Sequence, residues 1–227
     1  MRLLWLAVVA TTLGCGRGPA IPVDREVVSY TDPFVLPFGR VDPVNAAGDS
    51  LRVRWASHYL RAMNEPRLDP RAFSHDVYRF TYMPSFRPKV TLRLMRRPDG
   101  CLYVRKEVRE VKIPEDSLQV DTILKAWSVP LSVSAADSVP VGRLECDVIV
   151  DHMVKLHLGA GPEPEFALGP DGEGWLFEQI RDGHYQARQV WSPDSSRNSR
   201  FYEAGMTFFR VARYAGNGFP ARPTTFP

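Results

Sequence analysis

The segment 175–191 predicts a β-hairpin more clearly than any other part of this chain predicts a structural element. Two runs with strand composition flank Asp182-Gly183, and Asp-Gly is among the strongest short signals for a two-residue hairpin turn. Such a turn places Arg181 opposite His184 and sets the register of every other pair along the two strands. The chain is therefore expected to contain an antiparallel sheet.

The predicted hairpin also sorts its side chains onto two faces. One face carries Leu176, Glu178, Ile180, Tyr185 and Ala187, and the other carries Trp175, Phe177, Arg188 and Val190. If the first face packs on helices, the carboxylate of Glu178 is buried and must be paired or have a raised pKa. Catalytic acids and bases show this pattern, but structural ion pairs show it too. Arg79 and Arg188 are the candidate partners for a structural pair.

A helix is expected where the first amphipathic stretch begins, near residue 50. Ser50 is a suitable N-cap, and Leu51, Trp55 and Tyr59 recur at steps of four residues. Pro66 ends the stretch, because proline has no amide hydrogen and disrupts a helix interior.

Three strands are expected to follow this helix. Apolar or aromatic residues alternate with others in 78–82 and again in 90–94, which indicates half-buried strands. A third strand begins at Cys101, and its alternation slips near Lys106, which suggests a bulge or a frayed end.

Two further helices are expected, one on each side of the hairpin in sequence. The stripe proposed for the earlier helix is Leu144, Val148, His152 and Leu156, and that for the closing helix is Phe201, Gly205, Phe208 and Ala212. The fold class is therefore α+β, a single domain with an antiparallel sheet of about five strands and about three helices mainly on one face.

The domain boundaries follow from composition. Residues 1–14 read as a signal peptide and 15–48, rich in Pro, Gly and Asp, as a lipidated N-terminus and tether. The α+β domain is expected to span 49–216, with 113–142 as an irregular insertion, and 217–227 form a tail.

The N-terminal segment has the character of an export signal. Arg2 precedes an apolar run at 3–10, which is far shorter than the roughly 20 residues that span a bilayer. The sequence Thr-Leu-Gly-Cys ending at Cys15 resembles the lipobox of bacterial lipoproteins, although Thr12 stands where that family prefers leucine. The resemblance implies lipid attachment at Cys15 and a membrane-anchored protein of the cell envelope. A secretory cut after Ala20, giving a periplasmic or secreted protein, and an uncleaved anchor are the alternatives.

Two cysteines remain once Cys15 is assigned to lipid. Cys101 and Cys146 form an even pair in an exported chain, where disulfides persist. A bond requires the helix that contains Cys146 to cover the face of the sheet on which Cys101 lies. Two buried thiols are the alternative.

Composition and spacing narrow the possible partners. The charges of the 29 basic and 26 acidic residues nearly cancel. The net charge therefore does not indicate binding to nucleic acid. The histidines show no metal-ligand spacing, and no cofactor motif is present, so neither a metal nor a cofactor is expected. Trp127, Trp175 and Trp191 are either a carbohydrate-binding platform or aromatic core.

Short motifs across residues 50–215 resemble a family of uncharacterised bacterial proteins, many of them exported. The residues that carry the pattern are Asp171, Gly172, Trp175, Glu178, Gly183, Tyr185, Trp191, Ser192 and Pro193. The resemblance implies one continuous domain and singles out Glu178. It implies no activity, because none is established for the family. The expected function is a non-enzymatic binding or assembly module with an unknown envelope partner. The alternative is an envelope hydrolase or other enzyme that uses Glu178 as acid or base.

Overall fold

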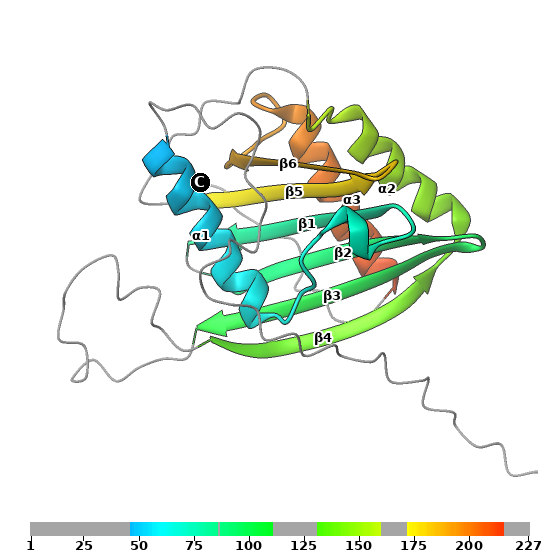
Figure 1. Cartoon of the computed structure of the whole chain (residues 1–227), viewed down its shortest axis with the longest axis horizontal. Coiled ribbons are helices and arrows are strands. Elements are labelled where there is room, and N and C mark those ends of the chain that lie inside the picture. Colours follow the sequence, from blue (N-terminus) through cyan, green and yellow to red (C-terminus); the bar gives the residue numbers. More distant parts are fainter. Residues whose placement is uncertain (1–45, 86, 111–130, 160–171, 216–227) are drawn as a thin grey trace, which may run out of the picture. The chain divides into compact units, whose positions relative to one another are not determined.

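The hairpin strands belong to a six-stranded sheet with the order β4-β3-β2-β1-β5-β6 (Figure 1). The computed structural model describes residues 46–85, 87–110, 131–159 and 172–215, which all belong to one compact unit, Pro33–Pro227. The elements in chain order are α1 (Ala46–Ala62), a 3-10 turn (Pro70–Ala72), β1 (Val77–Pro84), β2 (Lys89–Arg97), β3 (Gly100–Glu110), β4 (Leu131–Val141), α2 (Arg143–Lys155), β5 (Glu173–Arg181), β6 (His184–Trp191) and α3 (Ser199–Ala215). All neighbouring strands pair antiparallel.

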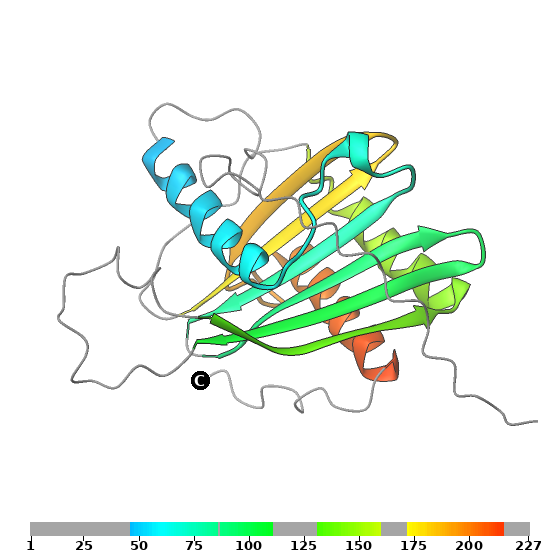
Figure 2. The same ribbon diagram turned by 60° about the horizontal axis from the view of Figure 1, so that its bottom comes forward.

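Helices cover both faces of this sheet. Helices α2 and α3 lie on one face and α1 lies on the other (Figure 1, Figure 2). The larger core, between the sheet and the α2–α3 pair, includes Phe80, Trp175 and Phe208. A smaller core beneath α1 includes Leu60 and Leu176. The strands contribute side chains to both cores because successive side chains of a strand point to opposite faces of the sheet.

The expected α+β class, with an antiparallel sheet and three α-helices, is confirmed within the described residues. The sheet has six strands rather than five, because β4 lies inside the stretch 113–142 that was expected to be an irregular insertion. That expectation is wrong for residues 131–141, while 113–130 lie outside the described part of the chain. Strand β4 is an edge strand that exposes most of its side chains. Its apolar residues alternate with serines only from Leu131 to Ala135, so the pattern of a half-buried strand is short.

The hairpin forms with the predicted register. Asp182 and Gly183 occupy the turn with φ angles of 51° and 73°, as a type I′ turn requires at its two central positions. Arg181 pairs with His184, and the same register continues to Gly174 and Trp191 at the far end. The two faces of the hairpin are therefore those predicted from sequence.

A bulge lies where the alternation of the third strand slips. Glu107 of β3 pairs with Ala135, whereas its neighbour Val108 pairs with Val133. The extra residue is Ser134, so the bulge is in β4 rather than in β3 itself. The Ser134 hydroxyl donates to the Glu107 carboxylate at 2.9 Å, and this contact links the bulge to the neighbouring strand.

Helix α1 begins earlier than predicted. Its first residue is Ala46, so Ser50 lies inside the helix and is not its N-cap. Helix α1 ends at Ala62, before Pro66, as expected from the proline.

Helix α2 forms as predicted, but of the predicted stripe only Leu156, at the C-cap, is fully buried. Its buried residues are Cys146, Ile149, Val150 and Met153, whereas Leu144 and Val148 of the predicted stripe are 81% and 50% exposed. Both stripes have helical spacing, so the sequence periodicity does not choose between them. The disulfide at Cys146 links the second stripe to the sheet.

A glycine on α3 permits the closest approach between this helix and the sheet. A Cβ atom added at Gly205 would overlap the indole of Trp175 and lie 3.0 Å from Phe80. Both rings are buried, and they lie 5.2 Å apart, so neither can easily move aside.

Replacing Gly205 with alanine is therefore expected to destabilise the domain. Alanine gains about 1 kcal/mol over glycine in an ordinary helix interior, but overpacking a core costs about 1–3 kcal/mol. We expect a net loss, measured as a lower denaturation midpoint. Arg210→Ala, at an exposed position of the same helix, is the control and should change stability by less than about 0.5 kcal/mol. A Gly205→Ala protein as stable as the parent would contradict this packing.

Candidate functional site

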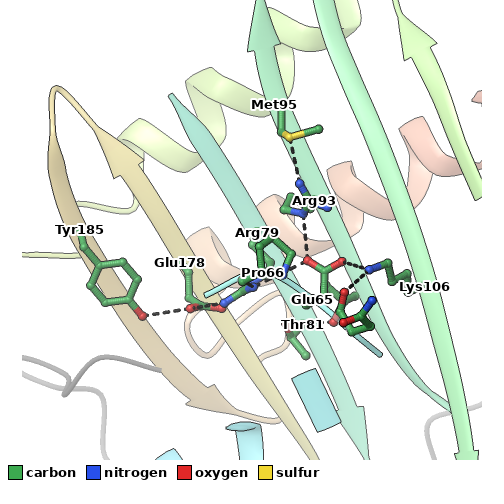
Figure 3. A network of polar contacts seen from close by, with 11 residues as sticks. Glu65, Pro66, Arg79, Thr81, Arg93, Met95, Lys106, Glu178 and Tyr185 are labelled. Carbon is green, nitrogen blue, oxygen red and sulfur yellow. Dashed lines mark hydrogen bonds and ion pairs between the residues drawn. The ribbon is translucent and has the colours of Figure 1, made fainter. Parts of the chain in front are cut away.

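Five charged side chains meet on the α1 side of the sheet, in a group that we name the buried ion network (Figure 3). Its members are Glu65, Arg79, Arg93, Lys106 and Glu178. The strand register assembles it, because Arg79 of β1 lies directly opposite Arg93 of β2 and Glu178 of β5. Lys106 comes from β3, and Glu65 follows α1.

The centre of the network is the pair formed by Arg79 and Glu178. Two parallel hydrogen bonds join them, from Arg79 Nε to Glu178 Oε2 and from Arg79 Nη2 to Glu178 Oε1, each 2.7 Å long. The Tyr185 hydroxyl donates to Glu178 Oε1 at 2.9 Å, and Arg79 Nη1 donates to the carbonyl of Pro66 at 2.7 Å. Both side chains of the pair are fully buried.

The surroundings of the pair shift the pKa values of Arg79 and Tyr185. Burial is the largest single influence and by itself lowers the pKa of Arg79, but the charge and hydrogen bonds of Glu178 and the charge of Glu65 together outweigh it, so the pKa of Arg79 is raised. Burial also raises the pKa of Tyr185, and the neighbouring Glu178 charge raises it further. Tyr185 is therefore a neutral hydrogen-bond donor at any ordinary pH.

Glu65 is the carboxylate that pairs with the other two cations of the network, Arg93 and Lys106. Its Oε2 lies 2.9 Å from Arg93 Nε and its Oε1 lies 3.0 Å from Lys106 Nζ, while Arg79 Nη1 is 3.7 Å from Oε2. Burial alone would raise the pKa of Glu65, but these cations, first Arg93, lower it. Sequence reasoning missed this residue, although it stands in the motif Asn64-Glu65-Pro66 that ends the first helical stretch.

This geometry matches the structural alternative for Glu178. An acid or base must exchange its proton with a reactant, and the exchange requires access to the carboxylate. Both oxygens of Glu178 already accept hydrogen bonds, and the side chain has no exposed surface. A carboxylate held in this way has the geometry of a structural ion pair. Of the two candidate partners, Arg79 is the one that pairs with Glu178, whereas Arg188 lies on the opposite face of the hairpin.

The disulfide considered from the sequence is present in the structure. Cys101 of β3 and Cys146 of α2 form a disulfide, with their Cα atoms 5.6 Å apart. Helix α2 covers the face of the sheet on which Cys101 lies, which is the arrangement that the bond requires. The bond therefore connects the sheet covalently to the helix layer.

Two of the residues considered for function, Cys15 and Trp127, lie outside the described part of the chain. Trp175 is buried in the larger core beneath α2 and α3. Trp191 lies on the other face, where its ring centroid is 6.2 Å from that of Trp55. The structure therefore does not bring Trp175 and Trp191 together as one platform, and it gives Trp191 a partner that was not predicted.

Within the described ranges, no group of three or more His, Cys, Asp or Glu side chains is placed to hold a metal ion. Comparison of the sequence with models of known protein families and with curated proteins finds no match. The resemblance to a family of exported bacterial proteins therefore stays a prediction. The structure nevertheless gives several residues of that pattern a physical role: Gly183 forms the hairpin turn, and Tyr185 and Glu178 belong to the same buried hydrogen-bonded group.

Proposed function

We propose that this chain is an exported, lipid-anchored protein whose domain is a non-enzymatic binding or assembly module of the cell envelope. The observation that carries this proposal is the disulfide between Cys101 and Cys146. Disulfides form and persist in oxidising compartments outside the cytoplasm and are rare inside it. The lipobox-like sequence that ends at Cys15 supports the same location and supplies a point of attachment.

The burial of Glu178 supports a binding role over the enzyme alternative. An envelope hydrolase that used this carboxylate would need it beside an open site with other polar groups converging on it. In the structure the carboxylate is enclosed by Arg79 and Tyr185. Among the residues that the structure describes, no helix is long and apolar enough to cross a bilayer, and in our proposal the lipid on Cys15 provides the attachment.

Replacing Cys15 with alanine tests the anchor. The parent protein should fractionate with membranes, because two or more acyl chains anchor a protein stably whereas one does so only marginally. The Cys15→Ala protein should appear in the soluble fraction or remain as an uncut precursor. Thr12→Leu, which brings the segment closer to the lipobox pattern, is the matched control and should leave the protein in the membrane fraction. Intact-mass data showing an unmodified chain that begins at Ile21 would refute lipid attachment.

A further inference from the structure

Gly172, directly before β5, and Gly174, its second residue, make room for two indole rings on the α1 side of the sheet. A Cβ atom added at Gly172 would lie 2.7 Å from the ring of Trp191, and one added at Gly174 would lie 2.7 Å from the ring of Trp55. The two indoles are half-buried, and their planes are inclined by 40°. Because Gly172 and Gly174 have no side chains, the two tryptophan rings pack directly against the backbone there.

A buried amide lies beside these rings without a hydrogen-bond partner. Gln189 precedes Trp191 by two residues on β6, so their side chains share a face. Its Nε2 lies 3.0 Å from the Cβ position of Gly174, which is also the position that Trp55 contacts. The side chain is only 6% exposed, and neither its nitrogen nor its oxygen makes a hydrogen bond to any residue that the structure describes.

An unsatisfied amide of this kind requires an explanation. Leaving a buried polar group without a partner destabilises the folded state, and most buried polar groups in native structures have a partner. A leucine of similar shape would avoid the cost at this position. A ligand that supplies hydrogen bonds to Gln189 would account for the amide being there.

We propose that Trp55, Trp191 and Gln189 form a binding site for a neutral saccharide ring. The C–H bonds on one face of a sugar ring carry partial positive charge, which suits the negative faces of the indoles. The sugar hydroxyls both donate and accept hydrogen bonds, as the amide of Gln189 requires. The three side chains carry no charge, so nothing in the group itself selects an ionic ligand. This inference rests on the proposed role as a binding module and names the class of ligand for it.

Titration of the full chain with soluble oligosaccharides tests the site. The protein is kept in a detergent without a sugar headgroup, and chitohexaose and cellohexaose are added while tryptophan fluorescence and heat of binding are recorded. We expect at least one of them to bind saturably with a Kd on the order of 1 mM or below, which is about −4 kcal/mol or stronger. Trp191→Ala should weaken that binding by about tenfold or more, because the stacking surface is lost.

Gln189→Leu separates binding from folding. The variant loses no hydrogen bond in the described part of the chain, so the stability should be unchanged or higher, whereas saccharide binding should weaken by about tenfold. Gln179→Leu is the matched control: Gln179 is also buried in β5 but lies on the opposite face, where it donates to Gln186 at 2.6 Å. Its replacement should leave saccharide binding unchanged.

Two results would overturn the site. One is the absence of saturable binding of either oligosaccharide up to about 10 mM, a concentration well above the expected Kd. The other is binding that Gln189→Leu and Trp191→Ala leave unchanged. Neither result bears on lipid attachment, because the titration does not depend on Cys15 and membrane fractionation does not depend on the tryptophans.

Discussion

Replacing Arg79 with methionine is expected to lower the free energy of unfolding by about 3–5 kcal/mol, the usual cost of removing one partner of a buried ion pair. The substitution leaves the Glu178 carboxylate fully buried with only the Tyr185 hydroxyl as a donor, and it also removes the donor to the carbonyl of Pro66. A domain of this size is typically stable by about 5–15 kcal/mol. Urea denaturation should therefore show a large shift of the midpoint, or a protein that is already partly unfolded.

Two further variants show whether the loss comes from the unpaired charge. Arg79→Met combined with Glu178→Leu removes both charges and should recover much of the stability, because apolar replacements of a buried pair are often neutral. Arg96→Met removes an arginine that is 44% exposed and lies 3.4 Å from Asp147, and it should cost less than about 1 kcal/mol. An Arg79→Met protein as stable as Arg96→Met would contradict the structural role of the network.

Removing the disulfide is expected to have the second largest effect. The bond joins residues 45 positions apart, and closing a loop of that length in the unfolded chain is worth up to about 4 kcal/mol in the chain-entropy model. The double variant Cys101→Ala, Cys146→Ala should lose a comparable amount. Helix α2 should be affected first, because the bond is its covalent link to β3.

Counting thiols in the denatured protein establishes whether the bond is present. In a Cys15→Ala background, only Cys101 and Cys146 remain among the three cysteines of the chain. We expect no titratable thiol without reductant and two after reduction. Two thiols without reductant would show that the cysteines are ordinary small apolar residues, and the double alanine variant should then cost much less.

The sequence by itself determined the local features of this fold. The turn at Asp182-Gly183 set the register of β5 and β6, because a two-residue turn leaves no freedom in the pairing of its strands. That register placed Glu178 on the same face as Leu176, and this was sufficient to predict a buried carboxylate. It also placed Arg188 on the opposite face, so the sequence already disfavoured that residue as the partner of Glu178.

Features that depend on distant parts of the chain were decided only by the tertiary structure. Arg79 pairs with Glu178 across 99 positions because β1 and β5 are neighbours in the sheet, and no local pattern encodes that neighbourhood. Glu65 joins the network because the segment after α1 lies against β1, β2 and β3, which carry Arg79, Arg93 and Lys106. Helix α2 offers two stripes of apolar residues, and its covalent link through Cys146 decides which of them meets the sheet.

Strand β4 and the contact between Trp55 and Trp191 are two further features that the sequence patterns did not predict. Strand β4 is held by backbone pairing to β3 more than by burial of its side chains, and its apolar alternation lasts only from Leu131 to Ala135, which is too short to mark the whole strand. Trp55 and Trp191 lie far apart in the sequence and meet only because α1 packs over the ends of β5 and β6. Periodicity and turn chemistry act over a few residues, whereas pairing and packing between distant segments depend on the whole folded chain.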